Sequence, residues 1–555
     1  MIGSAAGRNS LTVSKRRAHD VTRYPAPMGG INARQSIGSE DLNHCIYTYN
    51  LLPYEFGMKV RSGFREWTVG IDTGLGGASG VRTLIPFDSA IQGSVDDRMF
   101  AVTNEGIWNN IEFGEVPVLE VAFNNNGPRA GYGTYAHYVT DAGVSVLFYA
   151  DGANGLFTYA NGVWAQATGI TGPVIEDIKF VVVHKQRIWF ITENSTQAWY
   201  LGIGAIAGVA DPFFFGSKLR HGGTLEGLFN WSVDGGAGAD DHLVAVGHAG
   251  DIVVYAGADP TSADWNIVGT YFIGQIPNTP RFGTEQGGEL YLLSVFGVSS
   301  MNDILKGVDS NALESESSGI TLNVASIIRD RMATSINDAG WDVASIPSEG
   351  GLLVTFPPDG SQEPLQLYYN VAAKGWGFWR GVPMACFDSW RKNVFFGTDD
   401  GRVMRMDVPL DEVLITPLNN QTNGREINFS ILTAFNSLGS LGTYKRPKLI
   451  RPDFVSVLPP SHSSVCRYDY DTKETTNFLN AAPLPNDTAL WGANGVGSSN
   501  WDAAVWGTNI PSTFPTIGGV WGTGRYVAIA TRGTSSSETR LVGWDLIYDS
   551  GGPMI

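Results

Sequence analysis

LVAVGHAGDIVVYAG, residues 243–257, decides the fold class: two runs of alternating β-branched and small residues flank a turn at Gly250. A period of two is typical of half-buried strands, and a strand, a Gly-containing turn and a second strand form a hairpin. Similar units recur from residue 99 to residue 407. Six of them have turns that contain Gly106, Gly155, Thr196, Gly250, Gly297 and Gly401, and a further unit starts at Leu352.

The first five of those turn residues are 41–54 positions apart, and the unit at Leu352 fills the double gap before the last. A spacing of ~40–50 residues is the length of a four-stranded propeller blade, and a ring of blades covers the faces that one hairpin leaves open. We therefore predict a β-propeller of about seven blades over residues 68–408. A stack of β-sandwich domains is the alternative, with turns every ~8–12 residues and no longer period. The aromatic residues expected between the sheets are Trp108, Phe157, Trp189, Tyr255 and Phe395.

Two other regions depart from the blade pattern. Apolar residues recur every four positions at Val324, Ile328, Met332 and Ile336, which predicts the one short helix of an otherwise all-β chain, with serines 317 and 318 available as caps. After residue 408 new strand patterns predict a β-sandwich-like platform domain over residues 409–555.

Residues 25–67 contain an apolar run that a regular blade cannot use, so we expect this segment to pack with the platform. The Gly-rich part of the platform holds several tryptophans. We expect them to be packing anchors, with a sugar-stacking surface as the alternative. These tryptophans are Trp491, Trp501, Trp506 and Trp521.

Composition narrows the class of function. The chain has 37 Lys and Arg against 54 Asp and Glu, a net charge of −17. Proteins that grip phosphates broadly need many cationic side chains, so this balance argues against such a nucleic-acid binder. The 43% of hydrophobic residues and the 69 glycines favour a globular chain of short strands.

Cys45, Cys386 and Cys466 lack CxxC spacing, and we expect them to be buried thiols in a protein made in a reducing cytoplasm. The N-terminus lacks the apolar core of a signal peptide. The most apolar tract, residues 178–191, is interrupted by polar side chains and falls short of the ~20 residues that a bilayer span needs. We therefore predict no membrane segment.

Residues 1–24 form a basic arm in a protein that is otherwise acidic. A charge run of this kind is typical of a tail that binds nucleic acid or a protein partner, and the candidate partner contacts are Lys15, Arg16 and Arg17. The alternative is a solvated terminus that becomes ordered only in an assembly.

No catalytic constellation is evident: the sequence has no GxSxG, HExxH, GxxxxGK[ST] or CxxC motif. His242 and His248 lack an evident third metal ligand. The acidic pairs at 96–97, 240–241 and 399–400 predict turns, because Asp side chains hydrogen-bond to their own backbone there. A glycosidase needs two carboxylates that face each other at ~5–9 Å, which adjacent residues pointing to opposite faces cannot supply alone. We therefore predict no enzyme activity, no metal and no cofactor.

Three blocks of sequence carry a family resemblance. The first, PAPMGGINARQSIGSEDLNHCIYTYNLLPYEFGMKVRSGFREW (25–67), has a Gly-Gly-Ile-Asn core, a Leu-Pro step and an Arg-x-Gly-x-x-x-Trp ending. The others are YYNVAAKGWGFWRGVPMACFDSWRKNVFFGTDDGRVMRMD (368–407) and FNSLGSLGTYKRPKLIRPDF (435–454), followed by NWDAAVWG (500–507). Together they resemble the tail nozzle, or tail hub, proteins of short-tailed bacteriophages.

The resemblance implies a structural virion protein: a propeller subunit of a tail ring, usually a homohexamer, below the head-to-tail adaptor, through which the genome leaves. It implies contacts with copies of itself, the adaptor and tail fibre or needle proteins, transient passage of double-stranded DNA, and assembly in the cytoplasm of the host bacterium. It transfers no catalytic residues. The alternatives are a carbohydrate-binding, receptor-recognition propeller and, less favoured, a propeller enzyme.

An acidic wall repels phosphates and lets a duplex slide, so the net charge of −17 suits a conduit. Within this interpretation the acidic stretch 303–316, expected to be a loop, is the candidate to project into or beside the lumen. A solvated outer loop, or a docking site for another tail component, is the alternative. Its acidic residues are Asp303, Asp309, Glu314 and Glu316.

Overall fold

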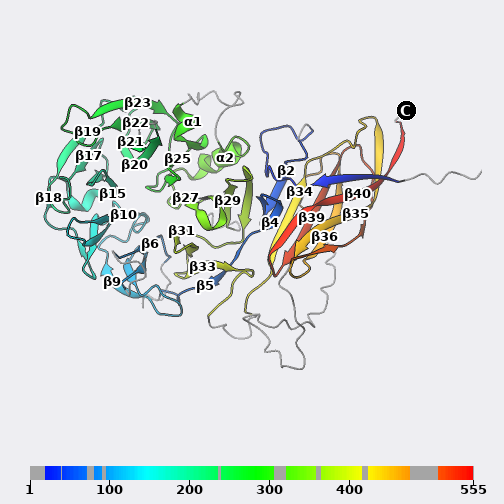
Figure 1. The fold of residues 1–555 in the computed structure, drawn as a ribbon, viewed down its shortest axis with the longest axis horizontal. Helices are drawn as coiled ribbons and strands as arrows, with labels where there is room; N and C mark the ends of the chain where they lie inside the picture. Colours follow the sequence, from blue (N-terminus) through cyan, green and yellow to red (C-terminus); the bar gives the residue numbers. More distant parts are fainter. Residues whose placement is uncertain are drawn as a thin grey trace, which may run out of the picture.

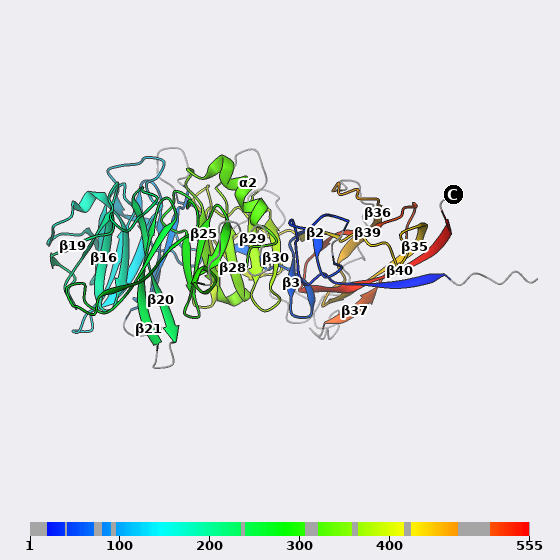
Figure 2. The same cartoon turned by 90° about the horizontal axis from the view of Figure 1, so that it is seen from above.

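The computed structural model describes residues 19–38, 41–71, 80–89, 96–234, 239–305, 320–357, 364–415, 423–474 and 511–553. The chain forms a ring of small sheets at one end and a layered β-domain, the platform, at the other (Figures 1 and 2). The all-β propeller and the sandwich-like platform predicted from the sequence are therefore confirmed.

Each blade of the ring is an antiparallel meander whose first strand lies nearest the axis (Figure 1). The first three blades consist of β6 (Thr83–Phe87), β7 (Arg98–Val102), β8 (Gly106–Asn109) and β9 (Val118–Ala122); β10 (Thr134–Val139), β11 (Ser145–Ala150), β12 (Leu156–Ala160) and β13 (Val163–Gln166); and β15 (Ile178–His184), β16 (Arg187–Thr192), β17 (Gln197–Tyr200) and β19 (Asp211–Phe214). A short parallel pair, β14 (Ile170–Thr171) and β18 (Gly208–Val209), and two 3-10 turns, η1 (Ile175–Asp177) and η2 (Pro347–Glu349), decorate the ring.

The remaining blades complete the circle. They consist of β20 (Leu225–Asp234), β21 (Ala239–Gly247), β22 (Asp251–Ala256) and β23 (Asn266–Phe272); the three-stranded β24 (Gly283–Gln286), β25 (Glu289–Ser294) and β26 (Gly297–Ser300); and β31 (Cys386–Trp390), β32 (Asn393–Gly397) and β33 (Val403–Val408) with β5 (Gly63–Glu66). In the described residues these make six separate blade sheets, one fewer than expected.

The seventh position of the ring holds β27 (Asp342–Ile346), β28 (Gly351–Thr355), β29 (Leu365–Asn370) and β30 (Gly375–Arg380). β27 contacts β24 on one side and β31 on the other, as a blade would. These strands are not a separate sheet, because β30 pairs in parallel with β2 (Cys45–Tyr49) and the sheet continues into the platform.

The last blade of the ring is completed by β5, a strand that comes before the first blade in the sequence. β5 precedes the first blade in the chain but pairs with β33, where Glu66 lies opposite Met404. The propeller therefore begins at residue 63 and not at residue 68 as expected. Because the chain runs from β5 into the first blade, this pairing ties the first blade to the last.

The aromatic residues predicted between the blades are all buried, which confirms that part of the prediction. Trp108 and Phe395, for example, belong to one apolar cluster between the first blade and the last. Phe157 packs with Phe87 and Phe100 between the first two blades. Aromatic side chains of this size supply the inter-sheet core that short strands need.

The platform is a sandwich of two sheets. One sheet has β3 (Leu51–Tyr54), β4 (Gly57–Val60), β40 (Thr539–Pro553), β35 (Thr443–Ser456) and β37 (Ser512–Pro515), with β1 (Asp20–Pro25) on β40 and β38 (Gly518–Gly519) on β35; the other continues from β2 through β34 (Ile427–Thr433), β39 (Val527–Ser535) and β36 (Ser461–Tyr468). Trp544 Nε1 donates to Thr531 Oγ1 at 2.9 Å between the two sheets. Phe429 and Phe454 meet there with ring centroids 6.0 Å apart.

Residues 25–66, expected to pack with the platform, pair with strands of both domains: β2 inserts between β30 and β34, and β4 pairs with β40. The arm proposed for residues 1–24 is shorter than expected. Residues 1–18 lie outside the described residues, but Asp20–Pro25 forms β1 and pairs with β40 from Tyr548 to Gly543. The buried Tyr24 hydroxyl donates to the Val527 carbonyl at 2.9 Å, which fixes this strand.

The described residues contain two short helices. The predicted helix is α2 (Ala325–Ser335), and Ile328 and Met332 are buried as the four-residue spacing indicated. Its first turn lacks a side-chain cap, and it begins too late for the proposed serines, which lie outside the described residues, to cap it. The second helix, α1 (Met301–Leu305), was not predicted.

One tryptophan prediction is wrong. Trp521 is 87% exposed, although we expected a packing anchor. Its backbone carbonyl is fixed by the Tyr468 hydroxyl at 2.9 Å, and the following Gly522 has φ +123°, so the chain turns there and directs the indole outward. The other three tryptophans of that set lie outside the described residues.

The three cysteines are buried thiols that form no disulfide within the described residues, as predicted. Burial raises the pKa of Cys386 and of Cys466 to about 12, so both remain thiols near neutral pH. Among the described residues, no helix has the length and apolar character needed to cross a membrane.

Candidate functional site

A cluster of charged and phenolic side chains lies at the axis of the propeller. Its members come from different blades: Tyr135 from β10, Arg281 just before β24, Asp342 from β27 and Asp388 from β31. The first strands of the blades converge on the axis (Figure 1), so residues far apart in sequence meet there.

Three contacts hold this axial cluster together. Arg281 Nη1 lies 3.1 Å from Asp342 Oδ2, and Arg281 Nη2 donates to the Arg82 carbonyl at 2.8 Å. The Tyr135 hydroxyl donates to Asp388 Oδ2 at 2.6 Å. The cluster therefore links five segments around the ring and fills its centre with ion pairs and hydrogen bonds.

Burial dominates the protonation of these groups. It raises the pKa of Asp342 to about 7, although the Arg281 guanidinium opposes the shift. Burial also raises the pKa of Asp388 to about 6, and the hydrogen bond from Tyr135 opposes it. The phenol pKa of Tyr135 rises well above its usual value for the same reason. Both carboxyls therefore change charge near neutral pH, as desolvated acids do.

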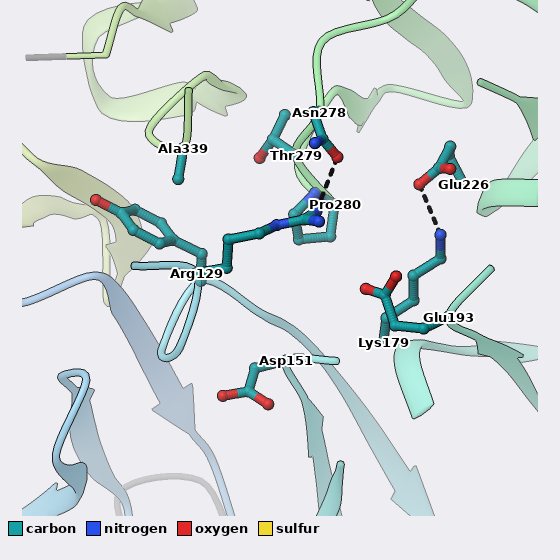
Figure 3. A pocket seen from close by; sticks show the side chains of 10 residues that line it. Arg129, Asp151, Lys179, Glu193, Glu226, Asn278, Thr279, Pro280 and Ala339 are labelled. Carbon is teal, nitrogen blue, oxygen red and sulfur yellow. Dashed lines mark hydrogen bonds and ion pairs between the residues drawn. The ribbon is translucent and has the colours of Figure 1, made fainter. Parts of the chain in front are cut away.

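A polar pocket of about 400 Å³ lies at one mouth of the axis. Figure 3 shows its charged side chains, with Lys179 bound to Glu226 at 2.7 Å and Arg129 donating to Asn278 Oδ1 at 2.7 Å. Asp151 accepts backbone N–H groups of Gly131 and its own turn, so it stiffens the pocket wall. Lys179 and Glu226 thus neutralise each other, whereas Arg129 and Asp151 are bound by neutral groups.

A second pocket, about 510 Å³, lies where the ring meets the platform. Behind it Arg61 and Asp411 form a buried bidentate pair with both N–O distances 2.7 Å. Arg380 binds Glu474 at 2.9 Å and covers the ring of Tyr49 at 4.0 Å. Removing one partner of a buried pair costs about 3–5 kcal/mol because one charge is left unmatched, so these contacts resist separation at the junction.

The residues predicted as sites are only partly described. Lys15, Arg16 and Arg17 lie outside the described residues, as do Asp309, Glu314 and Glu316. Asp303 lies in α1 and not in a loop, which corrects that expectation; its backbone N–H donates to Ser300 Oγ at 3.1 Å and so begins the helix.

Other candidates from the sequence have structural contacts. His242 packs on Trp231, whereas His248 lies 3.9 Å from Glu226. In the described ranges no group of three His, Cys, Asp or Glu side chains is placed to hold a metal. Asp400 binds Thr398 and Arg402 within one hairpin turn, as predicted for the pair at 399–400.

The axial cluster was missed at the level of sequence. A charged residue at or near the start of the first strand in three units, at 281, 342 and 388, would have been the signal. That these three residues meet at the propeller axis can be seen only in the folded ring.

Comparisons with known proteins add little. No protein-family model matches the sequence, and the search of curated proteins found no match. Among solved structures, the extracellular domain of a hybrid two-component system from B. thetaiotaomicron is 10% identical, with TM-score 0.37, 62% of this chain covered and 39% of that chain. YCF48 bound to a D1 peptide is 9% identical, with TM-score 0.35 over 61% and 93%. BBS1N in complex with ARL6DN is 12% identical, with TM-score 0.27 over 39% and 63%. Similarity this distant carries no argument about function.

Proposed function

We propose that this protein is a structural subunit of a bacteriophage tail, a nozzle or hub ring below the head-to-tail adaptor through which the genome is ejected. The observation that carries the proposal is the meeting of the sequence blocks that resemble nozzle proteins. The first block supplies β2 and β5, which pair with β30 and β33 of the second block. It also supplies β4, which belongs to the same sheet as β35 of the third block.

A local detail explains the Gly-Gly-Ile-Asn core of the first block. Gly30 has φ +68°, and a Cβ there would overlap the Trp376 carbonyl oxygen of the second block. The Ile31 N–H donates to that same carbonyl at 2.9 Å. The motif is thus the place where the segment before the ring touches the blade shared with the platform. A rigid union of ring and platform suits a subunit that has to keep its shape in an assembly.

The closed propeller axis bears on where DNA would pass. Arg281, Asp342 and Asp388 occupy the centre of the ring, so the conduit has to be formed between copies of the chain. Residues 63–408 contain 19 Lys and Arg against 38 Asp and Glu, whereas the remainder contains 18 against 16. The excess acid of the protein is therefore carried by the propeller, and an acidic wall lets a duplex slide.

The test is to measure the mass of the purified protein by light scattering and to image it by electron microscopy. A hexameric ring predicts about 360 kDa, six times 59.7 kDa. Antibody labelling of phage particles should place the protein in the tail. A monomer that is retained on glycan columns would instead support the receptor-recognition alternative, and turnover of a glycan would support the enzyme.

A further inference from the structure

The β8–β9 hairpin carries an exposed surface that is both apolar and acidic. Four large apolar side chains there are between 40% and 57% exposed. Three glutamates are interleaved with them on the same connection and strand. We call the following set the hairpin surface: Glu112, Phe113, Glu115, Val116, Val118, Leu119 and Glu120.

This hairpin surface is held in place by contacts with the chain that follows β5. Trp67 Nε1 donates to the Ile111 carbonyl at 3.2 Å, and the Gly114 N–H donates to the Trp67 carbonyl at 2.9 Å. The Val69 N–H donates to the Glu115 carbonyl at 3.2 Å. The exposed apolar side chains are thus presented on a fixed backbone, which lowers the entropy cost of binding a partner.

The charge of the hairpin surface is not balanced locally. Within the described residues none of its three glutamates forms an ion pair, and Glu120 accepts only a hydrogen bond from Asn109 at 2.6 Å. The nearby Arg65, whose guanidinium lies over the Phe113 ring, is already paired with Asp407 at 2.6 Å. A basic partner with apolar side chains would complement this surface.

The chain itself contains such a partner. Residues 1–18 include Arg8, Lys15, Arg16 and Arg17 and no acidic residue, with Leu11 and Val13 among the apolar ones. We propose that the segment 1–18 of one copy docks on the hairpin surface of a neighbouring copy. The proposal rests on the ring assembly proposed above and adds the contact that joins its subunits.

The position of β1 favours a neighbouring copy over the same chain. Asp20 pairs with Tyr548 near the end of β40, whereas β4, which leads toward the ring, pairs with β40 at Leu541. These points are seven residues apart along β40, or about 24 Å at 3.4 Å per residue. Figure 1 shows β1 starting at the end of the platform opposite the propeller, while β9 lies on the far side of the ring. The residue at which the segment 1–18 joins β1 is thus remote from the hairpin surface of the same chain.

The first experiment measures binding of a fluorescent peptide of residues 1–18 to protein lacking those residues. We expect saturable binding that weakens as NaCl is raised, because exposed charges are screened. The triple variant E112K/E115K/E120K should bind about tenfold more weakly or worse, since it replaces three attractive charge pairs by repulsive ones. The variant V116S/V118S, which keeps every charge, should also bind more weakly.

A control variant matched to E112K/E115K/E120K carries the same change of charge elsewhere on the propeller. D141K/E176K/D264K reverses three exposed acids outside the hairpin surface and should bind the peptide as the unaltered protein does. Equal loss in both triple variants would reduce the effect to general electrostatics and overturn the proposal. Absence of any peptide binding would overturn it as well.

A mixing experiment separates docking on a neighbour from docking within one chain. Protein lacking residues 1–18 keeps the hairpin surface, and the E112K/E115K/E120K protein keeps the segment 1–18. If docking joins neighbours, a tag on one variant should retain the other variant after mixing, and neither variant should retain a second copy of itself to the same extent. The full chain decides between a neighbour and the same chain: zero-length cross-links of Lys15 to Glu115 in a mixture of unlabelled and heavy-isotope-labelled protein should join the two isotopic forms. Cross-links confined to one isotopic form would mean docking within one chain and overturn the proposal. Peptide binding and complementation are measured on purified protein, so their failure leaves the phage-tail assignment open to its own test.

Discussion

Gly30 shows how a single residue ties the ring to the platform. Its left-handed backbone and its contact with Trp376 both require the absence of a Cβ atom. The chain offers a matched control in Gly350, which has φ +69° but open space where a Cβ would lie, with no atom within 4 Å of that point.

We predict that G30A lowers the free energy of unfolding more than G350A does. G350A should cost about 1–2 kcal/mol, the usual penalty of a left-handed non-glycine residue. G30A adds a clash with a backbone carbonyl, for which overpacking costs a further ~1–3 kcal/mol. Urea unfolding followed by tryptophan fluorescence gives both values. Equal losses would mean that the contact with Trp376 relaxes without cost.

Asp342 links stability to pH through the axial cluster. Its pKa rises from 3.8 to about 7 on folding, so the folded protein holds a proton that the unfolded chain releases above pH 4. Stability from this group is greatest at low pH and is lost as pH rises toward 7, at about 1.4 kcal/mol per pH unit. Burial is the main cause of this rise in pKa; Asp388 adds to it, and Arg281 and the hydrogen bond with the Val343 backbone oppose it.

We predict that D342N flattens the decline of thermal stability between pH 5 and pH 7. An amide cannot ionise, so the part of the slope due to this carboxyl disappears. Melting temperatures of the variant and the unaltered protein at several pH values provide the test, and D264N is the control at an exposed position. A variant with the same slope as the unaltered protein would show that Asp342 does not titrate in this range.

At the scale of elements, the segment before the propeller is shared between both domains. β2 lies inside the long sheet, β4 pairs with β40, and β5 closes the last blade. Removing residues 25–66 would open three sheets at once and expose their apolar faces. Each buried side chain of this kind contributes ~1.5–3 kcal/mol.

We therefore predict that deletion of residues 25–66 yields insoluble protein, whereas deletion of residues 1–18 leaves solubility and melting temperature near those of the full chain. Sedimentation of cell extracts and thermal shift of any soluble fraction measure this. Unchanged solubility after the larger deletion would show that none of the three sheets needs these strands.

Local pattern was enough to predict some elements and not others. The alternation around Gly250 and the spacing of Ile328 and Met332 report neighbours in the chain, so the hairpins and α2 could be predicted. The pairing of β5 with β33 joins residues about 340 positions apart, and periodicity carries no information on such partners. The axial cluster depends on the same long-range closure, which is why its charged residues were not recognised as one site.

At the scale of the whole molecule, charge is divided unequally. The propeller carries a net charge of −19, and the remainder of the chain carries +2. In a ring each charge is repeated by symmetry, so even weak repulsion per subunit adds up around a lumen. The acidic stretch that begins with Asp303 in α1 is the part of the propeller for which we propose a place beside the DNA.

The last prediction concerns this stretch in assembled particles. Replacing Asp303, Asp309, Glu314 and Glu316 by Lys should slow DNA ejection, because cationic side chains would bind the passing phosphates. The delay should be largest at low salt, since screening beyond ~10 Å is strong at 0.1 M. A control with D141K/E176K/D264K, which changes charge on other parts of the propeller, should eject DNA at the original rate. Ejection that is unchanged by the first variant at every salt concentration would place residues 303–316 away from the DNA, and slowing by both variants alike would mean that total charge and not this stretch governs transit.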